Sequence, residues 1–132
     1  MPEKILLIDD DEELCMELAS ILSDEGYSVE TALNGARGKQ LLETQVYALV
    51  ILDLKLPKIT GFELLRFIKA RSTEAPKVMV LSGRPIDEQF WSIAEIYLSE
   101  EEKTLRTADV IMTKPFDIDQ LLQHVRQVFA NL

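Results

Sequence analysis

Short apolar runs alternate with amphipathic stretches along the whole sequence. The apolar runs predict strands at residues 5–9, 27–31, 48–53, 77–82 and 109–113. Between them, apolar residues at helical spacing predict a helix that stops at Gly26, followed by helices at 35–44, 62–70 and 118–130. Strands that alternate with helices are typical of an α/β fold with a doubly wound, five-stranded parallel sheet.

The third predicted strand marks the centre of this sheet. Residues 48–53 read ALVILD, a continuous apolar run of the kind that is buried on both faces, whereas residues 27–31 alternate and suit an edge strand. We assume the common flavodoxin-like strand order 2-1-3-4-5, in one domain over residues 1–132.

The fourth βα unit is enlarged, because 31 residues separate Ser82 from Lys114. Ser99 followed by Glu102 matches a capping box and predicts the start of one helix in this segment. Trp91 lies beside the apolar stripe of another, and packing is a simpler role for it than anchoring a partner. We therefore expect two consecutive helices here, the first with the stripe Ile86, Phe90, Ile93, Ala94, Tyr97 and Leu98.

Charge and hydropathy exclude several classes of function. Acidic residues outnumber basic ones by 23 to 14, which gives a net charge of -9. Direct nucleic-acid binding is therefore not expected, since phosphate backbones are bound by clustered Lys and Arg. No apolar stretch is long enough for a signal peptide or a membrane span, so we expect a cytoplasmic protein without membrane contact. The single cysteine, Cys15, is interpreted as a buried hydrophobe.

Polar residues stand where the predicted strands end. Asp9 and Asp10 come at the end of the first strand, Asp53 ends the third, Ser82 ends the fourth and Lys114 follows the fifth. Because the functional crevice of an open α/β sheet lies at the carboxyl ends of its strands, we expect these side chains to converge. Three carboxylates need a compensating charge, and a set of oxygen ligands suits Mg²⁺ or Mn²⁺ better than zinc.

Such a set is equipped to form an aspartyl phosphate. The central place of Asp53 makes it the best nucleophile, while Lys114 and Ser82 can bind the oxygens of the transferred group. Acids at the start of a helix also stabilise its dipole, which explains residues 11–13 but explains Asp9 less well. The only histidine, His124, lies in the last predicted helix and receives no role.

Two local features allow other interpretations. A cis bond before Pro115 would aim Lys114 inward, but the proline can equally well just separate the last strand from the last helix. Residues 34–40, NGARGKQ, lack the glycine spacing and the Ser or Thr of a P-loop. Gly35 and Gly38 are therefore interpreted as residues of a turn and a helix start.

As a set, these residues resemble the receiver domain of two-component response regulators, the CheY-like superfamily. Four blocks carry the resemblance, each in register with a strand: ILLIDDDEEL, VILDLKLPKITGFELL, VMVLSGR and VIMTKPF. The resemblance implies that Asp53 accepts a phosphoryl group from a histidine kinase or a histidine phosphotransfer protein. It also implies that Mg²⁺ is held by Asp9, Asp10, Asp53 and the backbone carbonyl of Lys55.

The remaining positions are assigned by the same resemblance. Ser82 is the switch hydroxyl, Lys114 contacts the phosphate before a cis Pro115, and Pro57 and Gly61 belong to the loop after the phosphorylated Asp. Three features depart from the family. Ile111 stands where many receivers have a switching aromatic, the unit between Ser82 and Lys114 is longer by about two to three helical turns, and cations occupy the two positions at which the family tunes the lifetime of its phosphate. These cations are Lys55 and Arg84.

The leading hypothesis is a phosphoacceptor switch that is not an enzyme, apart from catalysing its own phosphorylation and dephosphorylation. Phosphorylation would shift the segment after Ser82 and the surface of the last strand and helix, and so regulate an unidentified output partner or a phosphorylation-dependent homodimer. No output domain is expected within residues 1–132.

Three alternatives stay open. A receiver-shaped interaction module would work through its surfaces without phosphorylation. A phosphatase of the haloacid dehalogenase type would need a second Asp where Lys55 stands. A flavodoxin-like protein that binds FMN would not need the acidic cluster of the first strand.

Overall fold

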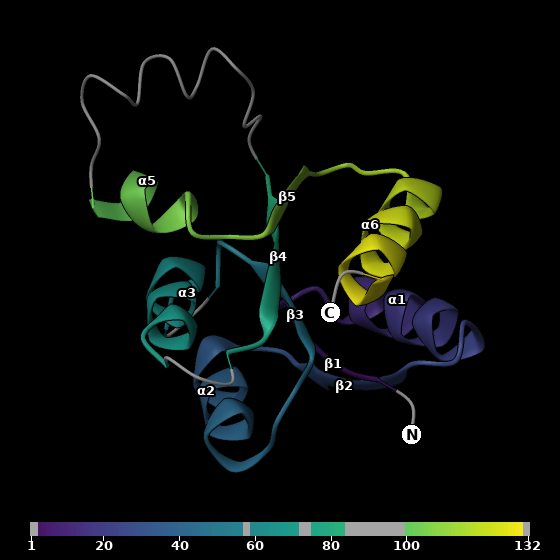
Figure 1. Ribbon diagram of the computed structural model, residues 1–132, viewed down its shortest axis with the longest axis horizontal. Helices are drawn as coiled ribbons and strands as arrows, with labels where there is room; N and C mark the ends of the chain where they lie inside the picture. The colour runs from purple at the N-terminus through teal and green to yellow at the C-terminus, as the bar shows by residue number, and fades with distance from the viewer. Residues whose placement is uncertain (1–2, 57–58, 72–74, 84–99, 131–132) are drawn as a thin grey trace.

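The computed structural model describes residues 3–56, 59–71, 75–83 and 100–130. Its strands are β1 (Lys4–Ile8), β2 (Ser28–Ala32), β3 (Leu49–Asp53), β4 (Lys77–Ser82) and β5 (Val110–Thr113). They form one parallel sheet in the order β2-β1-β3-β4-β5 (Figure 1). The predicted fold class and strand order are confirmed, and β3 is the central strand.

Two layers of helices cover the sheet. The helices are α1 (Glu12–Asp24), α2 (Gly35–Thr44), α3 (Gly61–Lys69), α5 (Glu100–Leu105) and α6 (Ile118–Ala130). Helices α2, α3 and α5 lie on one face, and α1 and α6 lie on the other (Figure 1). None of the described helices is long and apolar enough to cross a membrane.

The continuous apolar run of β3 follows from this double cover. Val50 and Leu52 pack in the core beneath α2 and α3, whereas Leu49 and Ile51 pack in the core beneath α1 and α6. All four are fully buried, because successive side chains of a strand point to opposite faces. The run therefore continues without polar positions up to Asp53 at its end.

Side-chain caps fix the ends of the helices near the strand ends. Asp11, Asn34 and Thr60 each accept a hydrogen bond from the backbone N–H three residues later, at the starts of α1, α2 and α3. The side chain of Asp117 accepts a hydrogen bond from the N–H of Asp119 at the start of α6. Gly26 ends the α1 turn with a φ of 99°, a conformation that glycine adopts easily.

Gly35 and Gly38 both lie in the first turn of α2, so the predicted helix start is confirmed, but Gly38 also has a packing role that was not predicted. A Cβ at Gly38 would meet Ile8 Cδ1 at 2.6 Å. The missing side chain lets α2 approach β1 closely, which a pattern of glycines along the sequence cannot distinguish from a turn.

Only part of the enlarged fourth unit falls within the described residues. Helix α5 begins at Glu100, directly after the predicted cap Ser99, and Leu105 at its end is fully buried in the core beneath α2 and α3. Ser99 itself, Trp91 and the apolar stripe from Ile86 to Leu98 lie outside the described residues, so the first of the two expected helices stays a prediction.

Candidate functional site

The predicted polar residues meet at the carboxyl ends of the central strands. Asp9 follows β1, Asp53 ends β3 and Ser82 ends β4, and these residues are 0%, 6% and 2% exposed. Asp10 is exposed beside them, and Lys114 directly follows β5. Parallel pairing brings these ends together, because Ile8 is in register with Leu52 in β3 and Asp53 is in register with Leu81 in β4.

Lys114 connects two of the buried acids. Its Nζ donates a hydrogen bond to Asp9 Oδ2 at 2.8 Å and lies 3.6 Å from Asp53 Oδ2. The Lys114–Pro115 peptide bond is cis, as the resemblance implied, and the Lys114 N–H donates to the Ser82 carbonyl at 2.7 Å. The two buried carboxylates therefore share one ammonium group.

Backbone groups hold the carboxylates in place. The N–H of Asp11 donates to Asp9 Oδ1 at 2.9 Å, and the N–H of Lys55 donates to Asp53 Oδ1 at 3.3 Å. The Cys15 thiol donates to the Asp9 carbonyl at 3.3 Å, so this buried cysteine supports the turn after β1. Burial raises the pKa of the thiol to about 11, with the charges of Asp9 and Asp11 adding to the effect, and Cys15 is thus a neutral packing residue as predicted.

Electrostatics in the site oppose the ionised form of Asp53. Burial raises the pKa of this carboxyl, and the negative charges of Asp9 and Asp10 raise it further. Lys114 and the N–H of Lys55 lower the pKa without cancelling the increase. Burial would lower the pKa of the Lys114 ammonium, but its hydrogen bond to Asp9 and the charges of both acids outweigh burial and raise it.

The acidic cluster fits a hard divalent cation. Asp9, Asp10 and Asp53 each offer a carboxylate oxygen, and these oxygens lie within 4.8 Å of one another. The donor set contains oxygen only and combines two buried acids with one exposed acid, which leaves room for water ligands. Such a set suits Mg²⁺ or Mn²⁺, and Lys114 alone carries too little charge to balance three carboxylates.

A pocket opens over these side chains, and it includes residues that the sequence had not indicated. Its lining combines Asp10, Asp53, Lys55, Ser82 and Lys114 with Leu54, Leu56, Thr60, Phe62 and Gly83. Thr60 and Phe62 are new, and their only sequence signal was a place in the block that contains Asp53. The side chain of Lys55 is exposed at this pocket, so the structure brings it to the site.

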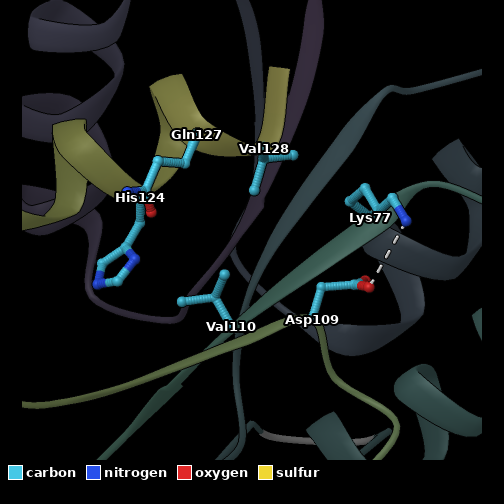
Figure 2. A pocket seen from close by; sticks show the side chains of 6 residues that line it. All are labelled: Lys77, Asp109, Val110, His124, Gln127 and Val128. Atoms are coloured by element: carbon cyan, nitrogen blue, oxygen red, sulfur yellow. Dashed lines mark ion pairs between the residues drawn. The ribbon is translucent and has the colours of Figure 1, made fainter. Parts of the chain in front are cut away.

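Other residues named in the sequence analysis lie away from the pocket or outside the described residues. Ile111 is partly buried against the core beneath α2 and α3. Arg84 and Pro57 lie outside the described residues. His124 lines a different pocket with Lys77 and Asp109, at the end of the sheet where β4 and β5 begin, opposite to Asp53 (Figure 2). It also lines a pocket with Thr113 and Pro115 at the other end of β5.

Comparison with known families identifies the chain. The sequence model of the response regulator receiver domain matches residues 5–126. The chain belongs to this family. The CpxR homolog of Haemophilus influenzae, a transcriptional regulatory protein, is 34% identical over 97% of the chain and 51% of its own length. The response regulator ArlR of Staphylococcus aureus is 30% identical over 97% of the chain and 53% of its own length.

Solved structures agree with this family. A Francisella response regulator receiver domain superposes with a TM-score of 0.80 at 25% identity, covering 98% of each chain. TrrA of Thermotoga maritima, whose crystal structure is a complex with Mg²⁺-BeF, gives a TM-score of 0.76 at 28% identity, over 96% of this chain and 98% of that one. The receiver chain spans about half the length of the curated relatives that it matches.

Proposed function

We propose that this receiver domain is a phosphoacceptor switch in which Asp53 takes the phosphoryl group. The observation that carries the proposal is the position of Asp53 at the end of the central strand, 6% exposed, with Lys114 Nζ at 3.6 Å and the oxygens of Asp9 and Asp10 within 4.8 Å. Asp53 also lines the pocket together with Ser82. The described site thus has a nucleophile, a hydroxyl, a cation and a cluster of metal-binding oxygens.

We propose Mg²⁺ or Mn²⁺ as the cofactor of this reaction. Asp9, Asp10 and Asp53 would hold it with the backbone carbonyl of Lys55, and TrrA provides the precedent of a receiver in complex with Mg²⁺-BeF. A bound divalent cation supplies positive charge that screens the approach of two anions. It would also favour the ionised carboxylate, which burial and the neighbouring acids disfavour.

Besides the cation and the phosphohistidine donor, the reaction uses only groups that the site contains. A carboxylate oxygen of Asp53 attacks the phosphorus of a phosphohistidine, so that an O–P bond forms while the N–P bond breaks and the imidazole leaves. Ser82 ends β4, Lys114 follows β5, and both line the pocket with Asp53, so they can bind the oxygens of the transferred group. Hydrolysis of the product would return the free acid, which makes the domain a catalyst of its own phosphorylation and dephosphorylation only.

The partners follow from this chemistry as further parts of the proposal. The donor is a histidine kinase or a histidine phosphotransfer protein, and the output is a partner protein, an attached domain or a second copy. The curated relatives are named as transcriptional regulators, and the receiver corresponds to about half of their length. The cytoplasmic location expected from the sequence stays a prediction.

Intact-mass spectrometry after incubation with acetyl phosphate and Mg²⁺ tests the proposal. We expect one phosphoryl adduct on the wild-type chain and none on Asp53→Asn. The adduct should disappear with hydroxylamine, which cleaves acyl phosphates and spares phosphoserine, and it should not form in EDTA. Asp11→Asn is the matched control, since it removes one exposed acid beside the site and keeps an oxygen for the helix cap.

Three results would contradict the proposal: a wild-type chain that gains no adduct, an undiminished adduct on Asp53→Asn, or an adduct that resists hydroxylamine. The first would favour a receiver-shaped interaction module, because the fold would then persist without the chemistry. The last would indicate that the phosphoryl group is attached to a hydroxyl, such as that of Ser82, and not to a carboxylate.

A further inference from the structure

Several described cations of this acidic protein can be compared by what holds them. Five of the described cations form ion pairs with carboxylates, namely Lys4, Lys69, Lys77, Lys114 and Arg126. Another group is held by neutral partners, and its members all lie on α2, on α3 or directly after α3. A cation held by a neutral group keeps its full electrostatic attraction for an external anion. In an ion pair, the partner carboxylate already neutralises most of that charge.

Phe67 of α3 is the centre of the second group. Lys39 Nζ of α2 lies 5.2 Å from the centroid of the Phe67 ring, and the Arg71 guanidinium lies 5.4 Å from the same centroid. Arg71 also donates a hydrogen bond to the Leu42 carbonyl at the end of α2. The ring and the carbonyl thus hold two positive charges close together at the junction of two helices.

Arg66 is a third cation with a neutral partner on the same helix. It precedes Phe67 on α3, it is exposed, and its guanidinium donates to the Thr104 hydroxyl of α5 at 3.3 Å. Among residues 3–56, 59–71, 75–83 and 100–130, the structure shows no ion pair between Lys39, Arg66 or Arg71 and a carboxylate. We call Lys39 and Arg71, which lie over the Phe67 ring, together with Arg66, the residue before Phe67, the basic surface.

We propose that the basic surface is a docking site for a short acidic segment of a partner protein. Charge complementarity carries the choice of partner. None of the three cations has a carboxylate partner among the described residues, and Lys39 and Arg71 repel each other over one ring, a repulsion that carboxylates from outside would remove. Neutral groups already hold all three side chains in place before a partner binds. The side chains therefore lose less conformational entropy on association.

Other anionic occupants fit the same surface less well. A nucleic acid presents a long row of phosphates, and three cations on a chain with a net charge of -9 compensate few of them. A second copy of this chain brings the same net charge of -9, which opposes association over distances longer than the surface itself. A short acidic segment can contact these cations without approaching most of the negative charges elsewhere on the chain.

Fluorescence anisotropy with a labelled oligoglutamate peptide tests the docking site on the full chain. We expect measurable binding at low salt that weakens as NaCl rises, because these charges are exposed to solvent. The triple variant Lys39→Gln, Arg66→Gln and Arg71→Gln should bind at least about tenfold more weakly. The matched control removes three paired cations instead, through Lys4→Gln, Lys77→Gln and Arg126→Gln, and should keep most of the affinity.

A variant that gains affinity makes the test independent of folding defects. Glu63 lies on α3 one turn before Arg66 and Phe67 and is exposed, so Glu63→Gln removes a nearby repulsive charge. It should bind the peptide about two- to fivefold more tightly. Circular dichroism and thermal unfolding of each variant verify the fold.

Four outcomes would overturn the proposal. The first is no binding at low salt, and the second is equal loss of affinity in the two triple variants. The third is tighter binding of an oligothymidine or of phosphatidylserine vesicles than of the peptide, which would assign the surface to another class of partner. The fourth is self-association in sedimentation velocity that disappears in the Lys39, Arg66 and Arg71 variant, since the occupant would then be a second copy.

Discussion

Lys114 has two acidic neighbours in the receiver site, and it is closer to Asp9 than to Asp53. Its Nζ is 2.8 Å from an oxygen of Asp9 and 3.6 Å from an oxygen of Asp53. Asp9 is also one of the three acids whose oxygens converge as a metal site. The ammonium group of Lys114 therefore neutralises carboxylate charge that a divalent cation would also bind. The two cations compete for the same acids.

Removal of this ammonium should strengthen metal binding. We expect Lys114→Gln to lower the dissociation constant for Mg²⁺ by about tenfold, because an opposite charge at this distance changes ionic equilibria by at least one order of magnitude. Isothermal titration calorimetry measures the constant directly. Lys77→Gln, which removes a cation at the opposite end of the sheet, is the control and should leave it unchanged. An unchanged or raised dissociation constant in Lys114→Gln would contradict the competition.

The raised pKa of Asp53 makes its charge a source of instability in the metal-free fold. The native state keeps the proton of this carboxyl to higher pH than the unfolded chain does, so the free energy of unfolding falls as pH rises from the ordinary value of 3.8 through the raised pKa. Asp53→Asn removes that loss. In EDTA at neutral pH, we expect the variant to be more stable than wild type by roughly 1 kcal/mol, a common size for one substitution.

Urea unfolding at a series of pH values verifies this sign. The stability gap between Asp53→Asn and wild type should narrow as pH falls toward the ordinary pKa of the carboxyl, and saturating Mg²⁺ should reverse it. Asp11→Asn serves as the control, since that acid is exposed at a helix cap. A gap that stays constant over the whole pH range would show that packing, and not ionisation of Asp53, sets the difference.

At the scale of elements, Gly61 fixes how α3 approaches the end of β3. A Cβ on Gly61 would meet the Asp53 carbonyl oxygen at 2.4 Å and Leu54 Cα at 2.5 Å, and both are backbone atoms that cannot move aside. The Gly61 N–H donates to the Leu54 carbonyl at 3.0 Å, which holds the first turn of α3 against the residue after Asp53. The helix and the acid are thus positioned by one close backbone contact.

Gly61→Ala should therefore disrupt the close contact between α3 and the end of β3 and destabilise the fold. We expect a loss of about 1–3 kcal/mol in the free energy of unfolding, the usual range for overpacking. Gly83→Ala is the matched control, because a Cβ there meets no atom of the described residues within 4 Å, and it should change stability by no more than about 0.5 kcal/mol. Equal stability of the two alanine variants in urea unfolding would refute the close contact.

The elements were predictable from the sequence because each carries its own signal. The apolar runs, the helical spacing of apolar residues, Gly26 and the capping box at Ser99 identified the described strands and helices within a residue or two of their observed ends. The strand ends also predicted which polar residues converge, since parallel pairing aligns those ends. The tight packing of Gly38 on Ile8 was missed, because it depends on the separation between α2 and β1 and not on any local pattern.

Side-chain partners between distant elements were not predictable in the same way. Nothing along the sequence indicates that Lys114 lies closer to Asp9 than to Asp53, because that choice depends on the geometry after the sheet has formed. The grouping of Lys39, Arg66 and Arg71 is a similar case. These cations are dispersed over more than thirty residues, and only the packing of α2 on α3 brings two of them to one ring.

At the scale of the whole molecule, metal binding and folding are coupled through the strand ends. Asp9, Asp10 and Asp53 belong to β1, β3 and the turns after them, so their oxygens converge only when the central strands are paired. The unfolded chain offers no such cluster. A cation that binds these oxygens therefore binds the native state and raises the free energy of unfolding in proportion to the logarithm of its concentration.

Magnesium should accordingly stabilise the whole receiver domain. At a concentration about 100 times the dissociation constant, linkage gives about 2.7 kcal/mol, which for a domain of this size raises the midpoint of thermal unfolding by roughly 5–15 °C. Differential scanning calorimetry in MgCl₂, compared with NaCl at equal ionic strength, measures the shift. Asp9→Asn with Asp10→Asn should abolish it, whereas Glu12→Gln with Glu13→Gln, which removes two exposed acids from the start of α1, should preserve it. A shift of the same size in NaCl, or in the Asp9 and Asp10 variant, would mean that general screening of the net charge of -9 stabilises the fold and that the acidic cluster has no special affinity for the metal.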